Sequence, residues 1–193
     1  MKNQKTLILV ESAILLGLAI ALSLVPLMKM PQGGSVTMLS MLPLVLVSIK
    51  HGLKWGLSAS FLYASYKFAT GIGEVMSWSM STQAVIGSSF LDYFVPFTLL
   101  GLAGLYRKAG FTGWCTGIVM VIFLRFACHF LSGLIIFGQW APEGTTPFVH
   151  SIAYNSAYMM PELIFTTIGA VTLFKTPYIR KLFAPPASVV PAD

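Results

Sequence analysis

Apolar residues gather in six segments, separated by short groups of polar, glycine and proline residues. The segments cover residues 6–28, 38–49, 53–70, 83–106, 112–137 and 150–174. Because a transmembrane helix needs roughly 20 apolar residues, the pattern predicts an all-α integral membrane protein, a bundle of six transmembrane helices. We expect residues 1–183 to form this single membrane domain and residues 184–193, rich in proline, alanine and valine, to form a disordered tail.

The composition agrees with this fold class. Of the 193 residues, 56% are apolar and 9% are charged, and the mean hydropathy is +0.80. Soluble domains are about 45–50% apolar and about 25% charged. The net charge of +6 forms no basic stripe, so nucleic acid is not an expected partner. The first apolar segment is too long for a signal peptide and has no small-x-small cleavage site, so we expect it to stay as a helix.

The basic residues predict the orientation in the membrane. Nine of them lie at the chain ends or in alternate connections: Lys2, Lys5, Lys50, Lys54, Arg107, Lys108, Lys175, Arg180 and Lys181. The other three connections hold Lys29, Glu74 and Glu143. Positive charges favour the cytoplasmic side, so both termini are expected in the cytoplasm.

Several classes of function are disfavoured by missing motifs. The two cysteines, Cys115 and Cys128, are 13 residues apart on one expected helix, about 20 Å along its axis, too far for a disulfide. The sequence has no phosphate-binding loop, no metal-spaced Cys/His cluster and no hydrolase motif. We therefore expect no metal, no cofactor and no enzymatic activity. A stand-alone transporter or channel is also disfavoured, because there is no internal repeat and no continuous polar path.

Three polar side chains within the apolar segments fall at similar depth. At 1.5 Å rise per residue, Asp92, His129 and Asn155 lie roughly 13, 12 and 8 Å below the outer ends of their helices. Ionisable groups in a membrane are costly and are often functional. Aromatic surface for the same site comes from Tyr93, Phe137 and His150. The sequence predicts a pocket that opens to the outside.

The fifth segment carries a stripe of residues spaced by four. Arg125, His129, Gly133 and Phe137 share one helix face, and we expect that face to point inward. Arg125 and Glu162 fall at similar, greater depth, which predicts an ion pair at the pocket floor.

The remaining charged and tryptophan side chains near helix ends have simpler expected roles. Glu11 and Lys67 are expected to extend to the membrane interface. Trp55 and Trp114 on one side, with Trp78 and Trp140 on the other, fit an aromatic belt. For Trp140 a second role stays open, that of closing over the pocket.

The first segment has a ridge of small residues, Ala13, Gly17 and Ala21. Such spacing lets another helix approach closely in lipid. The ridge either packs within the bundle or docks a partner protein.

Taken together, the motifs resemble those of the thiamine-specific substrate-binding subunits, or S-components, of energy-coupling factor transporters. The resemblance covers almost the whole chain and rests on residues 30–35, Leu91-Asp92-Tyr93, Arg125-x-x-x-His129-Phe130-x-x-Gly133, Phe137-Gly138-x-x-Ala141-Pro142-x-Gly144 and Tyr154-Asn155.

The resemblance implies a bacterial plasma-membrane protein of six helices. Such a protein captures thiamine from outside with high affinity and associates with a transmembrane coupling subunit and two ATPases. It also implies that Asp92 faces the thiazolium, that Tyr93 and His129 line the site, and that Asn155 bonds the ligand. The ridge on the first segment matches the docking motif.

The chain departs from the family pattern at one site position. His150-Ser151 stands where members commonly have Tyr-Ser, and Phe137 where some have tryptophan. Both rings can still stack on a ligand. The alternative ligands are a thiamine precursor or another water-soluble vitamin.

Overall fold

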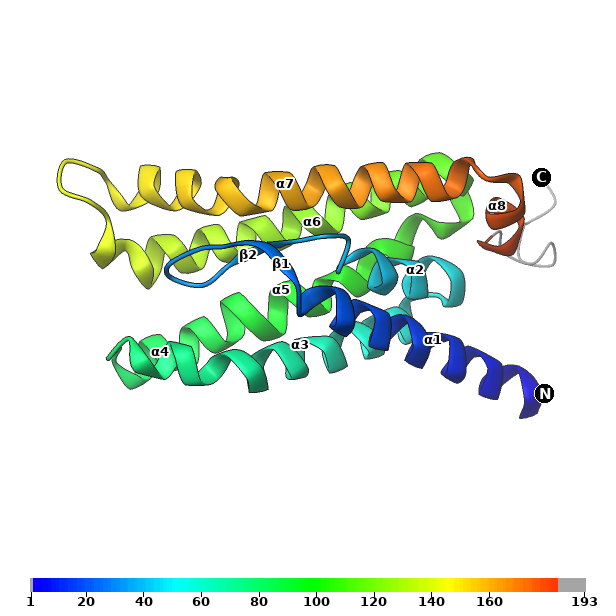
Figure 1. Ribbon diagram of the computed structural model, residues 1–193, viewed down its shortest axis with the longest axis horizontal. Helices are drawn as coiled ribbons and strands as arrows, with labels where there is room; N and C mark the ends of the chain where they lie inside the picture. The colour runs from blue at the N-terminus through cyan, green and yellow to red at the C-terminus, as the bar shows by residue number, and fades with distance from the viewer. Residues whose placement is uncertain (1, 184–193) are drawn as a thin grey trace.

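The computed structural model describes residues 2–183, and its long helices run side by side along the longest axis (Figure 1). The helical elements in chain order are α1 (Lys2–Ser23), α2 (Leu42–His51), α3 (Leu53–Ser77), α4 (Thr82–Ser88), η1 (Ser89–Phe94), α5 (Val95–Thr98), η2 (Leu99–Ala109), α6 (Gly110–Ile135), η3 (Phe137–Trp140), α7 (Pro147–Lys175) and α8 (Pro177–Phe183). The tail expected to be disordered, residues 184–193, lies outside the described residues.

A short β-hairpin follows α1, where the sequence pattern predicted that the first helix continues to residue 28. β1 (Pro26–Lys29) pairs antiparallel with β2 (Ser35–Thr37). The helix ends earlier because Pro26 has no N–H for a helical hydrogen bond and disfavours helical backbone at the residue before it. Gly33 and Gly34 both have positive φ, 79° and 86°, which glycine adopts without steric cost. The predicted loop is therefore an ordered hairpin.

Helix α3 is longer than predicted. It passes through the glycine-containing stretch 71–73, which was expected to be a break, and ends at Ser77. A Cβ added at Gly71 would lie 2.5 Å from the Tyr93 hydroxyl, so this glycine makes room for a packed ring instead of ending the helix. Lys67 consequently lies well inside α3, half-buried, and not at a helix end as predicted.

The segment from α4 to η2 is one continuous helical rod with a π-helical turn, η1, in it. Pro96 follows this turn, and a proline cannot donate the usual hydrogen bond to the carbonyl four residues earlier, which is that of Asp92. The Val95 N–H instead bonds the Phe90 carbonyl, five residues back. This local widening of the helix carries Asp92, and π turns of this kind are frequent at functional sites.

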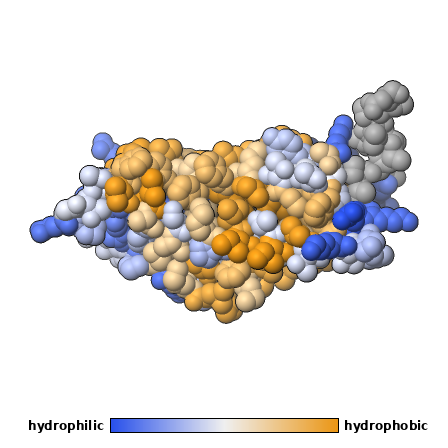
Figure 2. Space-filling model, turned by 90° about the horizontal axis from the view of Figure 1, so that it is seen from above, coloured by the Kyte–Doolittle hydropathy of each residue, from blue (hydrophilic) through white to orange (hydrophobic). Residues whose placement is uncertain are grey.

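The surface and the helix lengths identify a membrane protein. Apolar side chains cover the middle of the molecule and polar ones gather at its two ends (Figure 2). Within residues 2–183, three helical stretches are long and apolar enough to cross a membrane: Asn3–Ser23, Thr82–Ile135 and Pro147–Lys175. The second has 54 residues and folds back on itself between η2 and α6 (Figure 1). The all-α membrane fold is thus confirmed.

The count of six spans and the cytoplasmic placement of the termini stay predictions. Helix α2 has only 10 residues, about 15 Å of helix, which is too short to span a bilayer alone. The start of α1 and helix α8 do lie at the same end of the molecule (Figure 1). We call this the terminal end, and the opposite end, where α7 begins, the pocket end.

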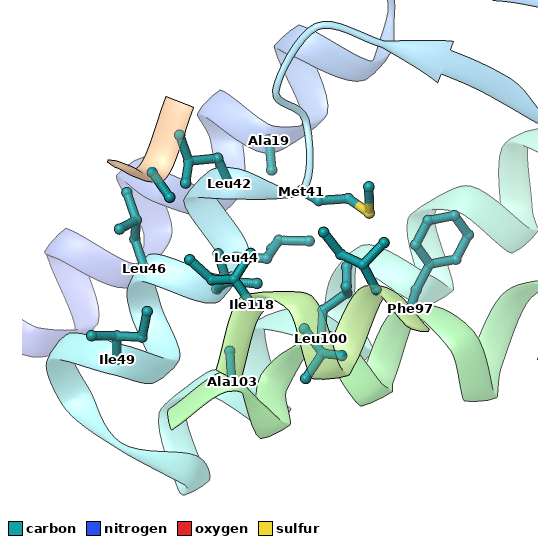
Figure 3. Packing of buried hydrophobic residues seen from close by; sticks show 14 of the residues in the cluster. Ala19, Met41, Leu42, Leu44, Leu46, Ile49, Phe97, Leu100, Ala103 and Ile118 are labelled. Carbon is teal, nitrogen blue, oxygen red and sulfur yellow. The ribbon is translucent and has the colours of Figure 1, made fainter. Parts of the chain in front are cut away.

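The apolar core is centred on α2, in the half nearer the terminal end. All residues from Leu42 to Ile49 are buried, and they meet α1, α5, η2 and α6 through Ala19, Phe97, Leu100, Ala103 and Ile118, among others (Figure 3). Glycines let the backbones touch here. A Cβ at Gly101 would lie 2.5–2.6 Å from backbone atoms of Gly56 and Leu57.

Two predicted interface side chains near the terminal end are instead part of the packed structure. Glu11 makes contacts of 2.8 Å with both Lys50 and His51, joining α1 to α2. Trp114 is only 1% exposed, donates its indole N–H to the Arg107 carbonyl at 2.8 Å and packs on Phe174. The prediction that Trp114 belongs to an exposed aromatic belt was wrong.

Candidate ligand-binding site

A pocket lies between the helices of the pocket end, beneath the β-hairpin. The empty space within it, including the part open to solvent, is about 540 Å³. Its walls come from the hairpin, α3, the α4–η1 rod, α6, η3 and α7. The lining residues are Gln32, Gly33, Val75, Trp78, Ser88, Asp92, Tyr93, His129, Gly133, Phe137, His150, Ser151, Tyr154, Asn155 and Tyr158.

Asp92 is the acidic residue of this pocket and is held by two donors from α6. Its Oδ2 accepts a hydrogen bond from the Ser132 hydroxyl at 2.5 Å, and its Oδ1 lies 3.0 Å from His129 Nδ1. The side chain remains 21% exposed. The carboxylate therefore has fixed geometry and still faces the cavity, where it can meet a ligand cation.

The neighbours of His129 define its tautomer. Arg125 Nε donates to His129 Nε2 at 3.2 Å, so Nε2 is the acceptor and the ring hydrogen is on Nδ1. That hydrogen then points to the Asp92 carboxylate. The hydrogen bonds from Arg125 to His129 and from His129 to Asp92 therefore fix a neutral imidazole ring in the wall of the cavity.

The ion pair predicted between Arg125 and Glu162 is absent, although both side chains are buried. Arg125 stacks on the Phe97 ring at 4.3 Å and donates to the Met41 sulfur. Glu162 Oε1 accepts hydrogen bonds from the N–H and the hydroxyl of Thr37, at 2.5 and 2.6 Å. Equal depth on two helices does not bring two side chains together, because each also has a direction around its own helix axis.

Helix α7 supplies a polar and aromatic wall. His150, Tyr154 and Tyr158 recur every four residues, and their rings contact one another in sequence. The Asn155 amide nitrogen donates to the Ser151 and His129 carbonyls, at 2.9 and 3.2 Å, and the Tyr158 hydroxyl donates to Asn155 Oδ1 at 2.7 Å. The amide hydrogens are thus occupied, and Asn155 offers a ligand one remaining oxygen lone pair.

Close packing of α6 on α7 explains Gly133. A Cβ at this position would lie 2.3 Å from the Ser151 hydroxyl and 3.0 Å from the Asn155 amide nitrogen. The stripe expected on this helix does face inward, since Arg125, His129 and Gly133 are buried and Phe137 follows in η3.

Aromatic rings form the rim of the pocket. Trp78 meets Phe137 edge to face at 5.6 Å, and Phe137 lies 5.5 Å from Trp140. Trp140 itself lines an adjoining cavity with Pro31 and Gln32 and is not among the residues of the main pocket.

Six of the seven residues predicted to bind substrate line the main pocket, and they are Asp92, Tyr93, His129, Phe137, His150 and Asn155. Residues that the sequence analysis did not assign to the site include Tyr154, Tyr158 and Ser132. The four-residue spacing of His150, Tyr154 and Tyr158 was a signal that could have indicated the two tyrosines. Nothing in the sequence indicated that Ser132 reaches Asp92.

The ridge of small residues on α1 lies outside the bundle. Ala13, Gly17 and Ala21 are all exposed, and a Cβ added at Gly17 would meet no atom within 4 Å. Packing of this ridge within the bundle, one of the two expectations, is therefore excluded in this conformation.

The arrangement is suited to binding and not to bond-breaking chemistry. One carboxylate, a neutral imidazole and a ring of aromatic side chains favour a flat cation with a few hydrogen-bonding groups. Among the described residues, no group of three His, Cys, Asp or Glu side chains is placed to hold a metal ion, and both cysteines are free. Fold and pocket are those of a membrane protein with a cavity suited to a small molecule.

Comparison with known proteins identifies the family. The sequence matches the thiamine transporter protein (Thia_YuaJ) family over residues 9–181. It is 34% identical over 191 residues to the thiamine transporter ThiT of Bacillus subtilis (strain 168), and this alignment covers 91% of the present chain and 95% of the relative. The identity to ThiT of Lacticaseibacillus paracasei is 24% over 183 residues, 86% of each chain. The chain belongs to this family of transporter proteins, which are not enzymes.

A solved structure shows the same fold. ThiT from Listeria monocytogenes superposes with a TM-score of 0.75 over 95% of this chain and 100% of that one, at 23% identity. The family and the apolar helices place the protein in the bacterial plasma membrane as a multi-pass protein. The family indicated by the sequence motifs is confirmed.

Proposed function

We propose that the protein binds thiamine in the pocket beneath the hairpin and takes part in its uptake. The observation that carries the proposal is Asp92, a carboxylate held by Ser132 and His129 and surrounded by aromatic rings. Thiamine combines a permanently cationic thiazolium ring with an aminopyrimidine ring. A cation in an apolar site needs a carboxylate nearby, and aromatic faces stack on both rings.

The polar groups of α7 and of the hairpin suit the aminopyrimidine. This ring carries both donors and acceptors. The pocket offers it acceptor lone pairs on Asn155, Ser151 and Tyr158, since the two hydroxyl hydrogens are already donated to the Phe130 carbonyl and to Asn155. The side chain of Gln32, which also lines the pocket, can supply a donor. The names of the relatives support the same ligand, since two of them are called thiamine transporters.

We further propose that the protein is an S-component, which delivers thiamine together with a transmembrane coupling subunit and two ATPases of an energy-coupling factor module. The ridge Ala13, Gly17 and Ala21 supports this, because it is an exposed helix surface on which another helix can pack closely. The pocket is also closed toward the terminal end by the core around α2. Delivery to that side then requires a partner that moves the bundle.

The ligand is tested by titrating purified protein with thiamine and with two comparison compounds. One is an isostere in which an uncharged thiophene ring replaces thiazolium, and the other is the free aminopyrimidine precursor. We expect thiamine to bind most tightly and to quench the fluorescence of Trp78 and Trp140. The control variant is Trp55→Phe, in which the quenching should be unchanged. If the precursor or another vitamin binds more tightly than thiamine, the proposal that thiamine is the ligand is wrong.

A further inference from the structure

The β-hairpin is attached to helix α7 at two points of different character. β2 packs against α7, and the turn between the strands reaches the pocket, where Gln32 and Gly33 form part of the lining. In Figure 1 the hairpin extends from the end of α1 toward the pocket end. A ligand bound in this pocket would lie beneath the turn.

The first attachment is at the base of the hairpin and is buried. Thr37 donates both its N–H and its hydroxyl to Glu162 Oε1, and the Thr37 hydroxyl also lies 2.5 Å from the Ser40 hydroxyl. Thr37 is 4% exposed and Glu162 is 1% exposed. Separating them would leave a carboxylate and a backbone N–H without partners in a dry interior, which is strongly unfavourable.

The second attachment is at the tip and consists of a single hydroxyl group. The Tyr154 hydroxyl accepts a hydrogen bond from the Gln32 N–H at 2.8 Å and donates one to the Gly33 carbonyl at 3.0 Å. Tyr154 and Gln32 are only partly buried, at the rim of the pocket. When these two bonds break, water can replace the lost partners, so opening the tip costs far less than opening the base.

The tip is shaped for this contact. The Met30 N–H bonds the Gly34 carbonyl at 2.9 Å and closes the turn. A Cβ at Gly34 would lie 2.8 Å from the Tyr158 ring, so the turn rests directly on α7 next to Tyr154. Within the described part of the chain, the side-chain hydrogen bonds to residues 30–34 come from the Tyr154 hydroxyl alone.

We propose that Tyr154 is a positioning residue that latches the hairpin tip over the bound ligand, while Glu162 holds the hairpin base as a fixed anchor. The inference rests on the proposed function, because the latch acts on a ligand in the pocket below. Release of the ligand then proceeds through breakage of the two Tyr154 bonds, with the base of the hairpin kept in place.

The test compares dissociation and association rates of thiamine in Tyr154→Phe and wild type by stopped-flow tryptophan fluorescence. The variant keeps the ring that packs against His150 and Tyr158 and removes only the hydroxyl. We expect dissociation to accelerate about tenfold, as for the loss of two ordinary hydrogen bonds, with association changed less than about twofold. The matched control is Tyr178→Phe, a hydroxyl on α8 that is 74% exposed, and its rates should equal those of wild type.

A second measurement needs no ligand. Hydrogen exchange of the ligand-free wild type should be fast at the Gln32 amide and slow at the Thr37 amide, and Tyr154→Phe should speed only the former. Equal protection of the two amides, or an unchanged dissociation rate in a folded Tyr154→Phe protein, would overturn the latch. If wild type fails to bind thiamine, the proposed ligand is wrong, and the exchange measurement alone then decides the inference.

Discussion

The two ends of this protein are built on different principles. Near the terminal end, α2 is buried along its length, and glycines bring backbones into contact, as Gly104 does with Ser48. Ser48 also accepts from the Gly104 N–H and donates to the Gly101 carbonyl. Near the pocket end, the interior holds a cavity, a carboxylate, an imidazole and a hairpin whose tip depends on one tyrosine.

The half near the terminal end therefore supports the fold, and the half near the pocket end is suited to recognising a ligand. A close-packed interior tolerates little displacement, so the half around α2 holds α3, the α4–η2 rod and α6 at fixed distances. Those three elements carry Trp78, Asp92 and His129 to the pocket. The pocket half can then contain a cavity lined by polar groups, because the positions of the helices that carry those groups are already defined by the other half.

Arg125 lies where the two halves meet. It stacks on Phe97 of the core and donates to His129 of the pocket. The guanidinium thereby transmits the position of the core to the imidazole, and through it to Asp92.

The largest expected effect is on stability and comes from the core half. Gly101→Ala should lower the midpoint of thermal unfolding in detergent by about 4 °C or more, or prevent folding, because its Cβ would overlap backbone atoms of α3, and overpacking costs about 1–3 kcal/mol. The matched control is Gly17→Ala on α1, where the added Cβ meets nothing within 4 Å. Equal midpoints for the two variants would contradict the view that the core half is the rigid support.

The next effect is expected in the pocket half, on affinity, with folding preserved. Asp92→Asn keeps the shape of the side chain but removes the charge, so thiamine binding measured by titration calorimetry should weaken by about 1–3 kcal/mol. The affinity of the uncharged thiophene isostere should fall much less in this variant, because the isostere makes no ionic contact with Asp92. Glu143→Gln, an exposed carboxylate in the loop between η3 and α7, provides the control. A folded Asp92→Asn protein with unchanged affinity would exclude the assigned role.

Much of this arrangement could be predicted from the sequence. Intramembrane charge singled out Asp92, and the four-residue spacing from Arg125 to Phe137 defined the inward face of α6, because both signals are local. The hairpin was missed because its strands, Pro26–Lys29 and Ser35–Thr37, are too short to show an alternating pattern. An apolar run before a turn is then equally consistent with a helix. Glu162 was paired with Arg125 and not with Thr37, because helical depth carries no information on direction around the axis. The contact of Tyr154 with the hairpin tip depends on that same hairpin.

The smallest effect on the isolated chain is expected at the α1 ridge, which belongs to neither half. Gly17→Leu adds bulk to a surface that the bundle does not use, so both the thermal midpoint and thiamine affinity in detergent should match wild type. Uptake by cells that express the complete energy-coupling factor module should nevertheless be lost, together with co-purification of the coupling subunit, because a small-residue ridge admits a partner helix only while it stays small. Leu18→Ala, a substitution at an exposed neighbour off the ridge, should preserve uptake. Normal uptake and normal assembly by Gly17→Leu would show that the partner docks elsewhere. The docking surface would then have to be sought on the two halves of the bundle.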